Sequence, residues 1–188
     1  MGSRIVIEPI ASEETLRASA VAEDMTFVEQ FSSVSRRCEV LAWRAIVRRE
    51  LGNGVEISHD EYGAPTVDTP NTYISVSHSR DRVAVLLADR ACAVDIESVE
   101  RDFRRVATRY LSKEEQQLAE QNDLYAEMWS AKEALYKYYK KGGLDFVNDI
   151  SVVAYDADGG VLRCSILKGE TIEVKVKRES GLVVALID

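Results

Sequence analysis

The chain contains one layout twice: an alternating strand, a polar turn and an apolar strand that ends in aspartate. The two copies are ISVSHSRDRVAVLLAD (74–89) and IEVKVKRESGLVVALID (172–188). A helix-like segment carrying one tryptophan precedes each copy, EVLAWRAIV in the first half and AEMWSAKEAL in the second. A repeat of about 90 residues predicts an α+β fold with two similar halves in a pseudo-twofold arrangement and a site at their seam. We expect the halves to be residues 1–98 and 99–188.

Local patterns predict the elements around this repeat. Ser12 and Ser112 are expected to cap helices, and Glu115, three residues after Ser112, completes a capping box. The apolar spacing within 33–51 predicts a helix that stops at a Gly-Asn-Gly run, 52–54. Further helices are expected at about 103–110, 112–121 and 126–141, strands at 4–10 and throughout 150–188, and a hairpin-like set of three strands within 73–97.

Composition excludes several classes of protein. The net charge of −8 argues against nucleic-acid binding, and no apolar run is long enough to span a bilayer. The three cysteines, Cys38, Cys92 and Cys164, have no metal-site spacing, so we expect them to be core residues of a cytoplasmic protein. Basic residues nonetheless cluster at 101–113 and 132–141, which indicates an anionic ligand or an acidic protein partner.

Asp95 and Glu97 end an almost wholly apolar run. Residues two apart on a strand face the same side, so both carboxylates are expected to lie together with Ile96 on the opposite face. Neighbouring carboxylates repel unless a cation lies between them, and oxygen ligands are those that Mg²⁺ prefers. The alternative is that the strand has ended and both acids are solvated.

The 126–141 helix has two stripes. Met128, Ala131 and Leu135 lie on a stripe that should pack against a sheet. The other stripe presents Glu133 with Lys137 four residues later. As an exposed ion pair these two side chains would contribute only about 0.3–0.5 kcal/mol.

Two further groups offer anion contacts. Ser77 and His78 lie on a strand that leads into a turn, where a hydroxyl and an imidazole can hold phosphate oxygens. The SRRCEVLAWR stretch supplies Arg36, Arg37 and Arg44. A structural histidine and solvated arginines are the simpler interpretation of these groups taken alone.

Taken in order, the motifs resemble a known family. The segments Y-G-A-P (62–65), I-S-V-S-H-S (74–79), A-V-D-I-E (93–97) and W-S-A-K-E-A-L-Y-K (129–137) are similar to those of the 4′-phosphopantetheinyl transferase superfamily. The similarity is greatest to its surfactin-type (group II) holo-carrier-protein synthases, and it extends over about residues 33 to 147. Ala64 departs from the family's usual lysine in the first motif.

This resemblance implies a pseudo-dimeric fold with coenzyme A in the cleft between the halves. By position, Asp95, Glu97 and Glu133 would ligate Mg²⁺, with Mn²⁺ as the alternative, and the metal would bridge the pyrophosphate of coenzyme A. The resemblance assigns phosphate contacts to Lys132 and Lys137, a diphosphate or 3′-phosphate contact to His78 beside Ser77, and the 3′-phosphate end to Arg36, Arg37 and Arg44.

The implied activity is transfer of the 4′-phosphopantetheine arm of coenzyme A to a serine of an apo acyl or peptidyl carrier protein. The product is 3′,5′-ADP, Glu133 accepts the serine proton and Lys137 assists. The partner would be an acidic carrier of fatty-acid, polyketide or nonribosomal-peptide biosynthesis, and one chain should suffice as a monomer. Two alternatives remain: a non-catalytic module that binds coenzyme A or a nucleotide, and a Mg²⁺-dependent phosphotransferase or nucleotidyl hydrolase.

Overall fold

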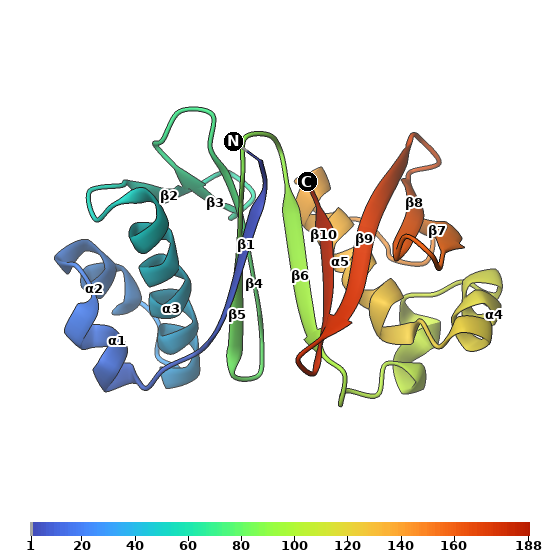
Figure 1. The fold of residues 1–188 in the computed structure, drawn as a ribbon, viewed down its shortest axis with the longest axis horizontal. Coiled ribbons are helices and arrows are strands. Elements are labelled where there is room, and N and C mark those ends of the chain that lie inside the picture. The colour runs from blue at the N-terminus through green and yellow to red at the C-terminus, as the bar shows by residue number, and fades with distance from the viewer. Residues whose placement is uncertain (1) are drawn as a thin grey trace. The chain divides into compact units, whose positions relative to one another are not determined.

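The computed structural model describes residues 2–188, and the chain divides into two compact units. We call Met1–Ala91 unit one and Cys92–Asp188 unit two. Each unit combines helices with antiparallel strands, which confirms the predicted α+β class (Figure 1). The two units are described separately.

Unit one packs three helices on one side of a small sheet (Figure 1). The sheet has the order β1-β5-β4 with antiparallel pairing, and a separate two-stranded ribbon joins β2 and β3. The elements are β1 (Arg4–Pro9), α1 (Glu13–Ser19), α2 (Ala22–Val28), α3 (Val34–Leu51), β2 (Ile57–His59), β3 (Pro65–Val67), β4 (Tyr73–Ser79) and β5 (Arg82–Ala88).

Local sequence signals account for the bounds of these helices. The Ser12 hydroxyl accepts from the backbone N–H of Thr15 at the start of α1, as predicted, and Ser33 caps α3 in the same way. Helix α3 ends at Gly52, whose φ of 106° favours glycine. The predicted strand at 4–10 and helix at 33–51 are therefore confirmed.

The three strands predicted within 73–97 are present, but only the first two form a hairpin. β4 and β5 form a hairpin through Arg80 and Asp81, and Arg80 adopts the left-handed conformation, with φ of 52°. The next strand, β6 (Ala93–Ser98), belongs to a different sheet, where Ile96 is paired with Val184 of β10 (Leu182–Ile187). Strand order along the chain could not show this pairing, because it joins segments about 90 residues apart.

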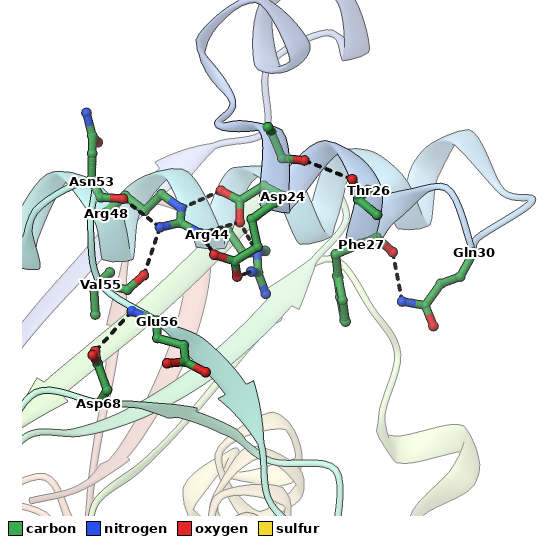
Figure 2. A network of polar contacts seen from close by, with 12 residues as sticks. Asp24, Thr26, Phe27, Gln30, Arg44, Arg48, Asn53, Val55, Glu56 and Asp68 are labelled. Carbon is green, nitrogen blue, oxygen red and sulfur yellow. Dashed lines mark hydrogen bonds and ion pairs between the residues drawn. The ribbon is translucent and has the colours of Figure 1, made fainter.

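A buried ionic network fixes α2 against α3 (Figure 2). Asp24 of α2 is 2% exposed and accepts from Arg44 at 2.5 Å and from Arg48 at 2.6 and 2.7 Å. Arg48 Nη1 also donates to the carbonyls of Asn53 and Val55, so the same side chain holds the segment that follows α3. Charge-assisted hydrogen bonds of this kind are the strong ones in a protein interior.

Unit two is built on a five-stranded antiparallel sheet with the order β6-β10-β9-β8-β7. Helix α5 contacts β6, β9 and β10. Besides β6 and β10, the elements are the 3₁₀ helix η1 (Arg104–Arg109), α4 (Lys113–Asn122), α5 (Tyr125–Tyr139), β7 (Ile150–Asp156), β8 (Val161–Ile166) and β9 (Thr171–Glu179).

Helix α5 buries the stripe that the sequence indicated. Met128, Ala131 and Leu135 are fully buried in the core of unit two, and burying a side chain the size of Leu135 stabilises by roughly 1.5–3 kcal/mol. The Ser112–Glu115 capping box is present at the start of α4, as predicted. The helix expected at 103–110 is a 3₁₀ helix, whose last turn closes from Tyr110 onto Ala107.

The three cysteines are buried, as predicted for core residues. Within residues 2–188, no helix has both the length and the apolar character needed to cross a membrane.

Asp24→Asn is expected to lower the free energy of unfolding of unit one by about 3 kcal/mol, because it removes the buried carboxylate that Arg44 and Arg48 share and leaves them only the half-exposed Glu23. Urea unfolding at neutral pH measures this change. The matched control is Glu8→Gln, which removes an exposed ion pair with Arg49 of α3 and should cost less than about 1 kcal/mol. Equal losses in the two variants would contradict the assignment.

The same network predicts a pH dependence. Burial alone would raise the pKa of Asp24, but hydrogen bonds from Arg48 and Arg44 outweigh it and hold the pKa below the ordinary 3.8. The stabilisation is therefore full above pH 3.8 and is lost as pH falls through the lowered pKa. The stability gap between wild type and Asp24→Asn should accordingly close in strong acid, and a gap that stays constant would count against the network.

Candidate functional site

Strand β6 and helix α5 bring two oppositely charged groups together. Asp95 of β6 is 5% exposed, and Lys137 of α5 donates to its Oδ1 at 2.7 Å and to the carbonyl of Val94 at 3.0 Å. The partner of Asp95 across the sheet is Ala185 of β10. The chain thus holds a carboxylate at low exposure, with a lysine from the facing helix as counter-ion.

Glu97 lies two residues further along β6 and has two donors of its own. The Trp129 indole N–H donates to Glu97 Oε1 at 3.1 Å, and Arg101 Nη1 donates to the same oxygen at 2.9 Å. Arg101 also lies over the Trp129 ring, with its guanidinium carbon 5.2 Å from the centroid. These two contacts hold the second carboxylate in place.

Glu133 brings a third carboxylate to this neighbourhood. Burial, and then the charges of Asp95 and Glu97, raise the pKa of Glu133, and Lys137 opposes part of that rise. The predicted pairing of an acid with a lysine four residues later on α5 is therefore more than an exposed ion pair. Both side chains interact with the acid-bearing strand β6.

The carboxylates of Asp95, Glu97 and Glu133 are suitable ligands for a divalent cation. A cation would relieve their mutual repulsion, and carboxylate oxygens are the preferred ligands of Mg²⁺. Within residues 2–188, however, no three Asp, Glu, His or Cys side chains are arranged as a ready metal-ligating group. A bound cation would compete with Lys137 for Asp95 and with Arg101 for Glu97.

Lys132 lies in the core of unit two. The sequence predicted a phosphate contact, but the side chain is 0% exposed and its ammonium forms an ion pair with Glu115 at 2.7 Å. The remaining donors go to backbone carbonyls of unit two. Burial lowers the pKa of Lys132, and the hydrogen bond with Glu115 partly offsets that. The ammonium is therefore held by protein groups, and the phosphate contact of Lys132 stays a prediction.

In unit one, the structure brings Arg36 and His78 together. Arg36 Nη1 lies 3.3 Å from His78 Nε2, and Glu39 Oε2 lies 3.2 Å from Arg36 and 3.4 Å from His78. The side chains of Arg36 and His78 are 47% and 41% exposed, so both are accessible to a ligand. Ser77 is buried and alternates with His78 along β4, so the two side chains point to opposite faces.

The other two predicted arginines have structural roles in unit one. Arg37 forms a two-pronged ion pair with Glu13 and donates to the carbonyls of Phe31 and Ser32. Arg44 is 1% exposed within the Asp24 network of Figure 2. Neither guanidinium is as exposed as that of Arg36, and the 3′-phosphate contacts of Arg37 and Arg44 stay predictions.

Sequence reasoning missed the residues that orient the predicted ones. The sequence places Trp129 in a predicted helix without giving it a role, and it does not single out Arg101 or Glu39. Glu39 follows Arg36 by three residues on a helix, a spacing that could have indicated the ion pair. The bond from Trp129 to Glu97 spans 32 residues and has no local signal.

Comparison with known proteins identifies the family. The family model described as 4′-phosphopantetheinyl transferase superfamily matches residues 91–187. The protein named 4′-phosphopantetheinyl transferase ffp, from Bacillus subtilis, is 33% identical over 169 residues, which is 81% of this chain and 75% of that protein. The protein named 4′-phosphopantetheinyl transferase Sfp, from B. subtilis strain 168, is 29% identical over 128 residues, 63% of this chain and 57% of that protein.

These similarities, together with the acid-lined site, make the chain a transferase. It belongs to the 4′-phosphopantetheinyl transferase superfamily and is an enzyme of that class. The matched stretch contains Asp95, Glu97, Glu133 and Lys137.

Proposed function

We propose that this protein transfers the 4′-phosphopantetheine arm of coenzyme A to a serine hydroxyl of an apo carrier protein. The serine oxygen forms a bond to the β-phosphorus of coenzyme A, the bond from that phosphorus to the bridging oxygen breaks, and 3′,5′-ADP leaves. The observation that carries the proposal is the group of Asp95, Glu97 and Glu133 with Lys137, which lies in the stretch that matches the family.

The three carboxylates would hold one Mg²⁺ ion, with Mn²⁺ as the alternative. When bound, such an ion neutralises negative charge on the diphosphate and so favours attack on phosphorus. The chemistry of the donor set and the raised pKa of Glu133 support this assignment.

Lys137 and Glu133 are the residues that we assign to the reaction itself. Lys137 presents an ammonium beside the carboxylates and would hold diphosphate oxygens. Glu133 would accept the proton of the serine hydroxyl, because it lies on α5 among the acids and the lysine of the site. The remaining catalysis comes from positioning of the serine and the diphosphate.

Unit one would supply the contacts to the nucleotide end of coenzyme A. Arg36 and His78 form an accessible pair. The Arg36 guanidinium and the His78 imidazole can both donate hydrogen bonds to phosphate oxygens. Each unit also contains a tryptophan-bearing helix, α3 or α5, that contacts a strand of an antiparallel hairpin, β5 or β10. This common layout supports the proposal of a pseudo-dimeric enzyme with two similar α+β halves.

The test is mass spectrometry of an apo acyl carrier protein incubated with this protein, coenzyme A and Mg²⁺. The carrier should gain one phosphopantetheine arm, and EDTA should abolish the gain. Glu133→Gln should slow transfer at least about 100-fold, because the variant lacks the general base. The control is Glu173→Gln on β9, an exposed acid paired with Arg163, which should transfer at the wild-type rate.

Two outcomes would contradict this proposal. Coenzyme A binding without transfer to several unrelated carriers would indicate a binding module. Phosphate release from nucleotides in the absence of a carrier would indicate a hydrolase.

The carrier itself should be acidic. Arg105 and Arg109 are exposed on η1, in the basic stretch 101–113, and such a surface steers an acidic partner. Replacing both with glutamate should raise the KM for the carrier about 10-fold and leave the KM for coenzyme A unchanged. Arg163→Glu, an exposed charge change on β8, is the control. A rise in both KM values would show that these arginines serve coenzyme A instead.

A further inference from the structure

Lys132 is bound on every side by protein. Its Nζ lies 2.7 Å from each of three backbone carbonyl oxygens, those of Tyr110, Phe146 and Ile150, and 2.7 Å from Glu115 Oε1. An ammonium has three hydrogens, so these four acceptors use its whole donor capacity. The carbonyls come from the end of η1, from the segment after α5 and from the start of β7.

Glu115 extends the same set of contacts. Its Oε1 also accepts from the backbone N–H of Val152 in β7 at 2.7 Å, and its Oε2 accepts from the backbone N–H of Ser112 at 2.7 Å. Glu115 is 4% exposed. The Lys132–Glu115 pair therefore joins α5 to backbone groups of four other segments of unit two.

Two of the carbonyls belong to residues whose rings enclose Trp129. The Tyr110 ring lies 5.1 Å from the Trp129 ring and edge-on to it, and the Phe146 ring lies 5.9 Å away. Trp129 precedes Lys132 by three residues on α5, so the pair and the indole occupy adjacent turns. Holding the backbone of Tyr110 and Phe146 in place therefore also positions the two rings that pack against the Trp129 indole.

The indole in turn determines where one acid of the site lies. Trp129 Nε1 donates to Glu97 Oε1 at 3.1 Å. We propose that the buried Lys132–Glu115 pair is a positioning device, which sets the indole through Tyr110 and Phe146 and thereby orients the Glu97 carboxylate for the cation. The part that concerns the cation rests on the proposed function, whereas the part that concerns the indole does not.

A purely stabilising role would not require a buried ion pair between Lys132 and Glu115. Replacing a buried ion pair by apolar residues of similar volume is often neutral or stabilising, so a fully desolvated pair is weak support for a role in stability. Partners that orient a metal ligand, in contrast, typically affect metal affinity or activity by 10–100-fold when they are removed.

The first measurement is made on the metal-free protein. The two tryptophans give two indole N–H resonances, and Trp43→Phe assigns them. In the double variant Lys132→Met with Glu115→Gln, which removes both charges together, the Trp129 resonance should shift while that of Trp43 stays. The control is Val174→Ala, a fully buried truncation on β9 that should leave both resonances in place. An unshifted Trp129 resonance in the double variant would overturn the proposal.

The second measurement follows transfer to a carrier as Mg²⁺ is varied. The double variant should need about 10-fold more Mg²⁺ for half-maximal rate, and so should Trp129→Phe, which keeps a ring but loses the N–H. Trp129→Phe also keeps the test open if the double variant fails to fold. An unchanged Mg²⁺ requirement in Trp129→Phe would refute the link to Glu97. Absence of transfer by the wild-type protein would instead refute the proposed function, and the indole comparison would still decide the positioning role.

Discussion

The repulsion among Asp95, Glu97 and Glu133 is the constraint around which unit two is organised. Burial and like charge raise the pKa of Glu133, which shows that the ionised carboxylates destabilise one another. Cationic groups and hydrogen-bond donors beside Asp95 and Glu97 offset part of this repulsion. Lys137 meets Asp95, and Arg101 and Trp129 meet Glu97. Helix α5 supplies Trp129, Glu133 and Lys137, and its other stripe is buried in the core of unit two.

Helix α5 carries two lysines in different environments. Lys137 remains partly exposed beside the acids. Lys132, in contrast, is fully buried and donates its hydrogen bonds to backbone carbonyls and to Glu115. Unit one repeats this division among its arginines. Arg36 is exposed beside His78, whereas Arg44 is buried and donates to Asp24. A cluster of basic residues in the sequence therefore contains both ligand-facing and structural members, and burial separates them.

Much of the fold was predictable because its signals are local. The caps at Ser12 and Ser112, the stop at Gly52 and the apolar stripe of α5 all act within a few residues. Three features were not local: the pairing of β6 with β10, the contacts of Lys132 with Glu115 and with backbone carbonyls, and the bond from Trp129 to Glu97. Each depends on contacts between segments far apart in the chain, which spacing alone cannot reveal. Helical spacing does place Lys132 beside the buried stripe, four residues after Met128 and three before Leu135, but it cannot show which groups the ammonium contacts.

The most direct measurement is the anomalous scattering of Mn²⁺ in a crystal of this protein grown with coenzyme A. The account predicts one strong peak within ligating distance, roughly 2.0–2.2 Å, of carboxylate oxygens of Asp95, Glu97 and Glu133, adjoining the diphosphate. Lys137 should then contact phosphate oxygen in place of Asp95 Oδ1. Coenzyme A bound with no peak at these carboxylates, or with the metal held by other residues, would contradict the account.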